Sequence, residues 1–474
     1  MSARALLHHR RRGLPSALGL TCASALLWGV AHLYIGRTRA GVALLALQAA
    51  LITMILLALT ALRLRLIPLA LRPEWLTVLV GALVLIGAVW VAVVILSYRA
   101  VRPARPGTAA RVLARGAVAA LCVVIMAPFA YTARLALVSR DVLITLFAAD
   151  GADDADPWRG RSRVNILLVG ADAARNRPGA RTDSMTVASI DTRTGRTILF
   201  GLPRNLERVP MPAGPARQRF PFGFTGDGTA RTPGLLNEVY QWAEDHPEIV
   251  PGVPDGRRGP TLLKRTVSEI LGIPVDHYAM VDMHGFAELI DAIGGVTVTI
   301  KSDIPYGRQG DILPAGTRRL SGKEALWYGR SRSDSSDYVR MARQKCLLYA
   351  VARQADAGLV LRGFERIADA AKRYVSTDIP RDMLPALAEL ATRPGAADLK
   401  SLQFVPPLIT PSDPDWYLIR RTVAQTLAAA DRPRPGRSAA SSASATSAPS
   451  GAPAGAPEPS PAPDRPADLA ALCS

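Results

Sequence analysis

Long apolar stretches dominate the first part of the chain, at about 14–36, 41–62, 75–98 and 112–138. A helix needs about 20 apolar residues to cross the hydrocarbon core of a bilayer. The second and third stretches meet this requirement. The fourth also does, because membrane helices tolerate a proline such as Pro128. The first stretch contains Pro15 and His32 and is the weakest span. The pattern predicts a membrane region over residues 1–140 with three or four transmembrane helices.

The positive charge of the chain is concentrated in this apolar region. The sequence has 57 Lys and Arg against 39 Asp and Glu, a formal net charge of +18. Residues 1–140 hold 16 Arg, no Lys and a single acid, Glu74, and therefore carry +15 of that charge. The remaining 334 residues carry only +3. A nucleic-acid-binding domain normally has a strong basic excess, so we expect no nucleic acid partner.

The arginines also indicate the topology of the membrane region. If all four stretches cross with the N-terminus inside, seven arginines flank the spans on each side. If the first stretch is re-entrant or interfacial, eleven arginines lie inside and three outside. The positive-inside rule favours the second arrangement. We therefore expect a multi-pass protein of the cell membrane, with everything after about residue 140 on the extracytoplasmic side.

The rest of the chain has the pattern of an α/β domain. After a short stem at 141–160, strands and helices alternate over 161–430, which favours an α/β sandwich. The expected strands lie at 163–170, 184–191, 197–202, 277–283, 296–300 and 399–406. The expected helices lie at 260–271, 284–292, 321–329 and over about 20 residues from Ser336.

The C-terminal residues 431–474 consist mainly of Ala, Ser, Pro and Gly. Such a segment cannot bury enough apolar surface to fold, so it is predicted to be a flexible tail. Cys473 is the next-to-last residue, and Cys346 lies on the last expected helix. In an oxidising exterior the two can form a disulfide. Two free thiols are an equally good interpretation, because connectivity cannot be deduced from sequence.

Charged residues follow the expected strands at several places. Asp172 comes after the first strand, and Arg181 and Asp183 precede the second. Two carboxylates across one loop can converge on a hard cation such as Mg²⁺. The alternative is that both are turn and cap residues. Arg204 follows the third strand, where the preceding proline restricts the backbone, although an ordinary loop arginine is the alternative.

The segment at 328–344 has the strongest concentration of polar groups. Arg330 and Arg332 alternate by two, so in an extended chain they point to one side. Asp337, Arg340 and Gln344 have the spacing of one helix face. Arginine forks bind phosphate oxygens in pairs, so this set suits a pyrophosphate. The alternative is a solvated helix with a local Asp337–Arg340 ion pair.

No other catalytic class has a matching motif in the sequence. There is no G-x-S-x-G, Walker loop, H-E-x-x-H or C-x-x-C pattern. An apolar sheet beside paired Arg and Asp residues instead suggests a lipid phosphate, with its chain buried and its head group bound by the charges.

Together these segments resemble the LytR–CpsA–Psr family of cell-envelope proteins. The matching stretches appear in the family's order: NILLVGAD (165–172), RTDSMTVASID (181–191), ILFGLPRN (198–205), LLNEVY (235–240), VDMHGFAELIDAIGGV (281–296), LPAGTRRLSGKEALWYGRSR (313–332) and DYVRMARQ (337–344). The resemblance implies a central mixed sheet between helices, with a hydrophobic pocket for a polyprenyl chain.

The resemblance also implies an activity. A Mg²⁺- or Mn²⁺-dependent phosphotransferase would move an anionic or secondary cell-wall glycopolymer from a polyprenyl-pyrophosphate carrier to peptidoglycan, forming a phosphodiester, with pyrophosphatase activity as a side reaction. Carried over by motif, the metal carboxylates are Asp172 and Asp183. The residues that would hold the pyrophosphate are Arg204, Arg330, Arg332 and Gln344. The residues expected beside the reacting group are Arg181, Asp337 and Arg340.

Two positions depart from the family pattern. The family commonly has Asp after the Pro-Arg pair, where this chain has Asn205. It often has a basic residue two positions before the Asn of the LLNEVY-type motif, where this chain has Leu235. One cation for the head group is then missing. A non-catalytic polyprenyl-phosphate-binding regulator of the envelope is therefore the alternative function.

Overall fold

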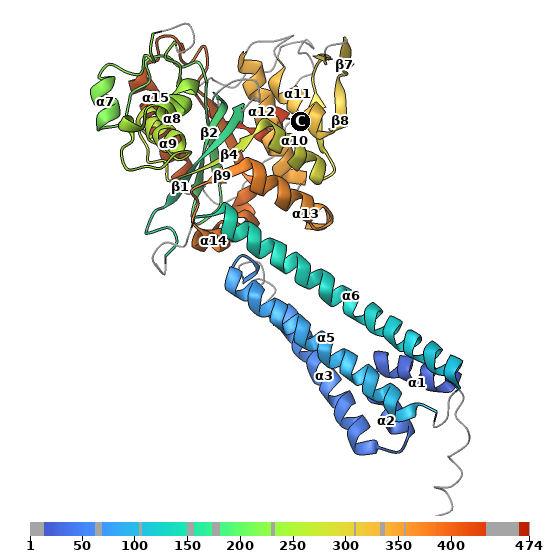
Figure 1. Ribbon diagram of the computed structural model, residues 1–474. Helices are drawn as coiled ribbons and strands as arrows, with labels where there is room; N and C mark the ends of the chain where they lie inside the picture. The colour runs from blue at the N-terminus through green and yellow to red at the C-terminus, as the bar shows by residue number, and fades with distance from the viewer. Residues whose placement is uncertain are drawn as a thin grey trace, which may run out of the picture. The chain divides into compact units, whose positions relative to one another are not determined.

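The computed structural model describes ten segments of the chain: 14–61, 69–103, 107–148, 156–172, 181–228, 233–307, 310–331, 337–354, 357–432 and 464–473. The chain divides into two compact units (Figure 1). The first unit comprises residues 1–151 and 380–389, and the second comprises residues 152–379 and 390–474. Arg332 lies outside the described residues.

The first unit is helical. Three of its helices are long and apolar enough to cross a membrane, namely Thr38–Ala58, Pro73–Val101 and Thr108–Leu146. Over residues 1–151 its described helices are α1 (Leu14–Leu26), α2 (Val30–Tyr34), α3 (Thr38–Ala61), α5 (Pro73–Val101) and α6 (Thr108–Leu146). The first apolar stretch is thus divided into two short helices, and α1 with 13 residues is too short to span a bilayer.

Side chains satisfy the backbone at the break between α1 and α2. Gln48 of α3 accepts a hydrogen bond from the Trp28 amide at 2.8 Å and donates one to the Leu26 carbonyl at 2.8 Å. Gly29 has φ +92°, and a Cβ there would lie 2.4 Å from the Gly41 carbonyl oxygen. Backbone polar groups must be paired in an apolar environment. The break is therefore part of the folded unit.

The second unit is built on a seven-stranded mixed sheet with the order β11-β10-β3-β2-β1-β4-β9. The β1–β4 and β10–β3 pairs are parallel, and the other four pairs are antiparallel. The strands are β1 (Arg163–Asp172), β2 (Arg181–Asp191), β3 (Thr197–Leu202), β4 (His277–Asp282), β9 (Val375–Thr377), β10 (Leu399–Gln403) and β11 (Ala467–Asp468). Two small antiparallel pairs are separate from this sheet: β5 (Val296–Ile300) with β8 (Gly316–Leu320), and β6 (Ile304–Tyr306) with β7 (Asp311–Leu313).

Helices lie on both sides of the sheet (Figure 1). A large apolar core joins the sheet to α8, α9 and α15, and a smaller one joins β5 and β8 to α10, α11 and α12. The helices that follow β3 are α7 (Pro215–Arg219), α8 (Val239–Asp245), α9 (Arg258–Leu271), α10 (Met283–Ala292), α11 (Gly322–Arg330), α12 (Asp337–Gln354), α13 (Ala357–Tyr374), α14 (Leu384–Thr392), α15 (Trp416–Asp431) and α16 (Leu469–Cys473).

All six expected strands and all four expected helices of the α/β region are present; the strands at 197–202 and 296–300 have the expected ends, and the other elements have shifted ends. The expectation of an extended chain at Arg330 is wrong, because Arg330 is the last residue of α11. The expected stem is also partly helical, since α6 continues to Leu146. The sequence patterns had not indicated α13, α15 or the three-residue strand β9.

The predicted flexible tail is wrong for the last described segment. Ala467–Asp468 forms β11 against β10, and Leu469–Cys473 forms α16. Cys473 is joined by a disulfide to Cys346 of α12. Of the two interpretations of these cysteines, the structure therefore has the disulfide. The predicted tail also began too early, since Asp431 is the last residue of α15; residues 433–463 and Ser474 lie outside the described residues.

Candidate functional site

A β-bulge places Asp183 at one end of the sheet. Gly170 pairs with Ser184 and Ala171 pairs with Thr182, so Asp183 is the extra residue on β2. A bulge changes the direction of the side chains that follow it. As a result Asp183 and Ser184 both line a cavity, whereas Thr182 is fully buried on the other side.

Asp172 lies at the same end of the sheet. It is the last residue of β1 and pairs across the hairpin with Arg181. Its Oδ2 lies 3.5 Å from Nη2 of Arg330 at the end of α11. The Arg330 side chain is 48% exposed, so this guanidinium is accessible to a ligand. The hairpin thus brings both predicted metal carboxylates to one edge of the sheet.

A compact network joins Asp183 to α12. Nη1 of Arg204 donates to Oδ1 of Asp183 at 2.5 Å, and Nε of Arg204 lies 3.6 Å from Oδ1 of Asp337. Arg340 makes a two-point contact with Asp337 at 3.2 and 2.9 Å. It also donates to the Asp183 carbonyl at 3.0 Å. The local Asp337–Arg340 ion pair exists, but Arg340 is only 5% exposed, so the solvated-helix alternative is wrong.

Gln344 lies one turn further along α12. Its Nε2 donates to the Gly329 carbonyl at 3.0 Å, which fixes the side chain against the end of α11. The predicted common face of Asp337, Arg340 and Gln344 is therefore present: the first two contact each other, and Arg340 and Gln344 line the same cavity. The structure gives no position for Arg332.

Arg181 lies at the beginning of β2, near a buried acid that the sequence patterns did not single out. Glu238 lies in the 3₁₀ helix Leu236–Glu238, where its Oε2 accepts hydrogen bonds from the amides of Gly234 at 2.9 Å and Leu235 at 3.2 Å. Burial raises the pKa of Glu238, while these two amides and the charge of Arg181 act in the opposite direction. The sequence carries no capping-box signature for this acid, because the N-cap position is Leu235, whose side chain has no acceptor.

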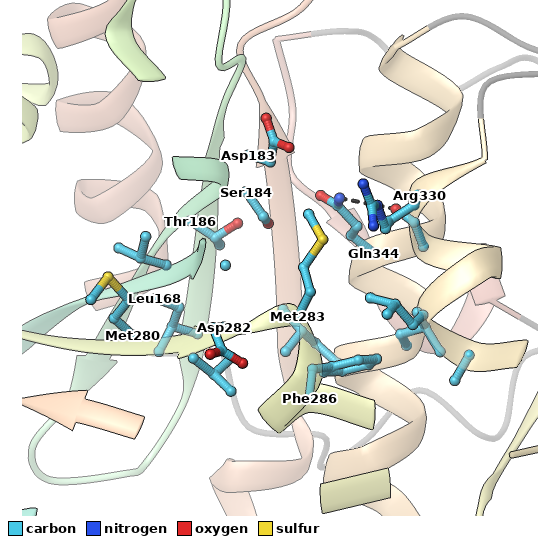
Figure 2. A pocket seen from close by; sticks show the side chains of 18 of the residues that line it. Leu168, Asp183, Ser184, Thr186, Met280, Asp282, Met283, Phe286, Arg330 and Gln344 are labelled. Atoms are coloured by element: carbon cyan, nitrogen blue, oxygen red, sulfur yellow. Dashed lines mark hydrogen bonds between the residues drawn. The ribbon is translucent and has the colours of Figure 1, made fainter. Parts of the chain in front are cut away.

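The cavity beside these residues has a volume of about 260 Å³. Figure 2 shows Asp183, Arg330 and Gln344 at one end and the apolar side chains of Leu168, Met280, Met283 and Phe286 below them. Asp282 also lines the wall, where its carboxylate caps α10 by accepting from the Gly285 amide at 2.6 Å. Its other apolar lining residues include Val169, Val281, Leu326, Leu347, Leu348 and Val375. The cavity thus has a charged mouth and an apolar interior.

The donor set at the mouth suits a hard cation that also binds a ligand. Within the described residues, no group of three His, Cys, Asp or Glu side chains is arranged to hold a metal ion. Asp172 and Asp183 offer two carboxylates at one sheet edge. Mg²⁺ commonly uses one or two carboxylates and completes its coordination with water and substrate phosphates. The residues therefore fit a metal that binds together with a phosphate.

The profile of the LytR_cpsA_psr family matches residues 147–412, more than half of the chain. This chain belongs to that family. The described site residues, from Asp172 to Gln344, all fall within the matched range.

This LytR_cpsA_psr protein is similar to several known proteins. It is 30% identical over 232 residues to the polyisoprenyl-teichoic acid–peptidoglycan teichoic acid transferase TagU of Oceanobacillus iheyensis, covering 48% of this chain and 63% of TagU. It is 27% identical over 227 residues to the regulatory protein MsrR of Staphylococcus aureus, covering 47% of this chain and 59% of MsrR. The matched region spans less than two thirds of these relatives. The crystal structure of B. subtilis TagV is 24% identical, with a TM-score of 0.40, and covers 56% of this chain and 96% of TagV.

Proposed function

We propose that this protein is a membrane-anchored phosphotransferase that moves an anionic or secondary wall glycopolymer from a polyprenyl-pyrophosphate carrier to peptidoglycan. The observation that carries the proposal is the cavity, which joins an apolar interior to a mouth of arginines and carboxylates. A polyprenyl pyrophosphate has the same two parts, a hydrocarbon chain and a charged head. The similarity to TagU, named as a teichoic acid transferase, supports this class of reaction.

The arginines would bind the pyrophosphate at the mouth. Arg330 is half exposed and Arg204 is partly accessible, and each contacts one of the two carboxylates, Asp172 and Asp183. A bound pyrophosphate would replace the carboxylates as the partner of these guanidinium groups. The two carboxylates would then be available to hold Mg²⁺ or Mn²⁺. The metal would supply charge neutralisation during phosphoryl transfer.

The reaction breaks a phosphoanhydride bond and forms a phosphodiester bond. A hydroxyl oxygen of peptidoglycan would attack the phosphorus next to the glycopolymer. The bond from that phosphorus to the bridging oxygen would break, and polyprenyl phosphate would leave and take up the proton that the acceptor hydroxyl loses. Asp337 holds Arg340 at two points and lies near Arg204. These contacts favour a positioning role for Asp337 over proton transfer.

The test uses the full-length protein in detergent with a polyprenyl-pyrophosphate-linked oligosaccharide and peptidoglycan fragments. We expect a phosphodiester-linked product in the presence of Mg²⁺ and its loss in Asp183→Ala. Arg318→Ala is the matched control, because Arg318 is an exposed arginine on β8 away from the cavity lining. Full activity of Asp183→Ala would refute the assigned site.

A non-catalytic regulator that binds polyprenyl phosphate is the second candidate. The similarity to MsrR, named as a regulatory protein, and the apolar Leu235 favour it. Binding of the carrier lipid without metal, and without turnover of any donor, would support this function over transfer.

The same proposal places the catalytic domain outside the cytoplasm. The three long apolar helices and the excess of arginine expected on the cytoplasmic side support a three-span anchor. A reporter active only outside the membrane, fused after residue 145, should be active. An inactive reporter would contradict this topology.

A further inference from the structure

The last described segment forms a strap across the edge of the sheet. We define the C-terminal strap as Ala467–Cys473, which comprises β11 and α16. Its strand pairs with β10, with Ala467 opposite Ser401 and Asp468 opposite Lys400. Its far end is joined covalently to α12 through the Cys346–Cys473 disulfide. The strap lies beyond residue 412, where the family match ends.

The strap is packed into the domain as well as bonded to it. Leu469 is 0% exposed and forms a small core with Ala188 of β2 and Leu199 of β3. Lys301 donates a hydrogen bond to the Leu472 carbonyl at 3.2 Å. Leu168 packs against this core and also lines the cavity. Leu168 thus belongs both to the cavity wall and to the apolar cluster in which the strap is packed.

The helix held by the strap is the one that carries the site. Cys346 follows Gln344 by two positions on α12, and Leu347 and Leu348 line the cavity. Lys345 lies between Gln344 and Cys346 in the sequence. Its ammonium donates to the Ser401 hydroxyl and lies 3.5 Å from the Leu402 carbonyl. The back of α12 is therefore joined to β10 directly by Lys345 and indirectly by the strap.

We propose that the C-terminal strap is a positioning element that holds α12 in the register at which Arg340 and Gln344 face the cavity. This inference rests on the proposed function for its kinetic consequence. Reduction of the disulfide by a dithiol takes up two electrons and two protons and yields two thiols, which releases Cys473 from α12. Donor binding then depends on whether Cys346 and Cys473 are oxidised to the disulfide, although Cys346 lies on the side of α12 opposite the cavity.

The kinetic test compares Cys473→Ser and Cys346→Ser with the unchanged full-length protein. We expect the KM for the polyprenyl-pyrophosphate donor to rise about tenfold and kcat to fall by a smaller factor, because α12 carries both Gln344 and Arg340 but neither side chain is removed. Treatment of the folded unchanged protein with dithiothreitol should give the same shift and should not affect Cys473→Ser. Cys122→Ser is the matched control, because Cys122 is a free cysteine of α6.

A second measurement keeps the inference separate from the proposed function. Amide hydrogen exchange over residues 340–350 should be faster in Cys473→Ser than in Cys122→Ser, whether or not any variant transfers a glycopolymer. Inactivity of every variant combined with this faster exchange would refute the proposed function and support the strap. Unchanged exchange in α12, or a lower Tm with an unchanged donor KM, would overturn the positioning role.

Discussion

The charged mouth and the apolar interior of the cavity are lined in part by the same elements, β2, α11 and α12, but different forces maintain them. At the mouth, Asp183, Arg204 and Arg340 are fixed by directional contacts of 2.5 to 3.0 Å. In the interior, Phe286 and Leu347 contribute apolar surface with no directional requirement. A change in this network of short contacts should therefore act on the chemical step, and a change in the interior should act on binding in proportion to the area removed.

Arg340→Ala should have the largest effect. It leaves Asp337 without its two-point partner and the Asp183 carbonyl without its donor. Loss of one preorganised donor at a reacting charge typically costs about 10²–10³ in rate, and we expect a loss of that size in glycopolymer transfer at saturating donor. Arg340→Lys keeps the charge but not the planar fork, so it should restore little. Recovery of most of the activity in Arg340→Lys would show that charge alone is sufficient.

Arg330→Ala should have a smaller effect at the same mouth. Its contact with Asp172 is longer, at 3.5 Å, and its side chain is half exposed, so water and salt screen it. We expect the donor KM to rise about tenfold or more, with the effect decreasing as ionic strength increases. A donor KM that is independent of salt in the unchanged protein would argue against pyrophosphate binding by Arg330.

Phe286→Ala tests the interior. Its ring lines the cavity and lies apart from Arg330 (Figure 2). Removing part of a buried aromatic contact costs about 1 kcal/mol in donor binding, which corresponds to about a fivefold rise in KM. The rise should occur with long-chain polyprenyl donors and be absent with a donor that has only a few carbons. An equal effect on both donors would mean that the interior does not hold the lipid.

The same contrast explains how much could be predicted from sequence. The strands at 163–170 and 197–202 were predictable because continuous apolar runs identify buried strands locally. The approach of Asp172 and Asp183 was predictable because a strand and the loop after it lie together in a hairpin. Local patterns thus located the elements and several of the residues that line the mouth.

Other features depend on contacts between distant residues. The bulge that turns Asp183 toward the cavity and the helical ending at Arg330 have no local signal in these segments. Lys345 was not predictable as a buried residue, because lysine is seldom buried. The strap was missed because its composition resembles a disordered tail, while its order comes from pairing with β10 and from Cys346, 127 residues away.

Lys345→Met should have the smallest effect and should act mainly on stability. Burial lowers the pKa of Lys345 from its ordinary 10.5 to about 7. The unfolded chain therefore binds this proton more tightly than the folded chain does. The resulting loss in the free energy of unfolding is fully present below pH 7 and decreases as the pH rises toward 10.5. Methionine removes the penalty together with two hydrogen bonds, so we expect a net gain of about 1 kcal/mol near pH 7. The Tm advantage of the variant should shrink between pH 7 and pH 9.5, with the donor KM changed less than in Cys473→Ser, because the strap still holds α12. A Tm advantage that grows with pH would contradict a lowered pKa of the buried amine. The charge of Lys345 would then stabilise the packing of α12 on β10.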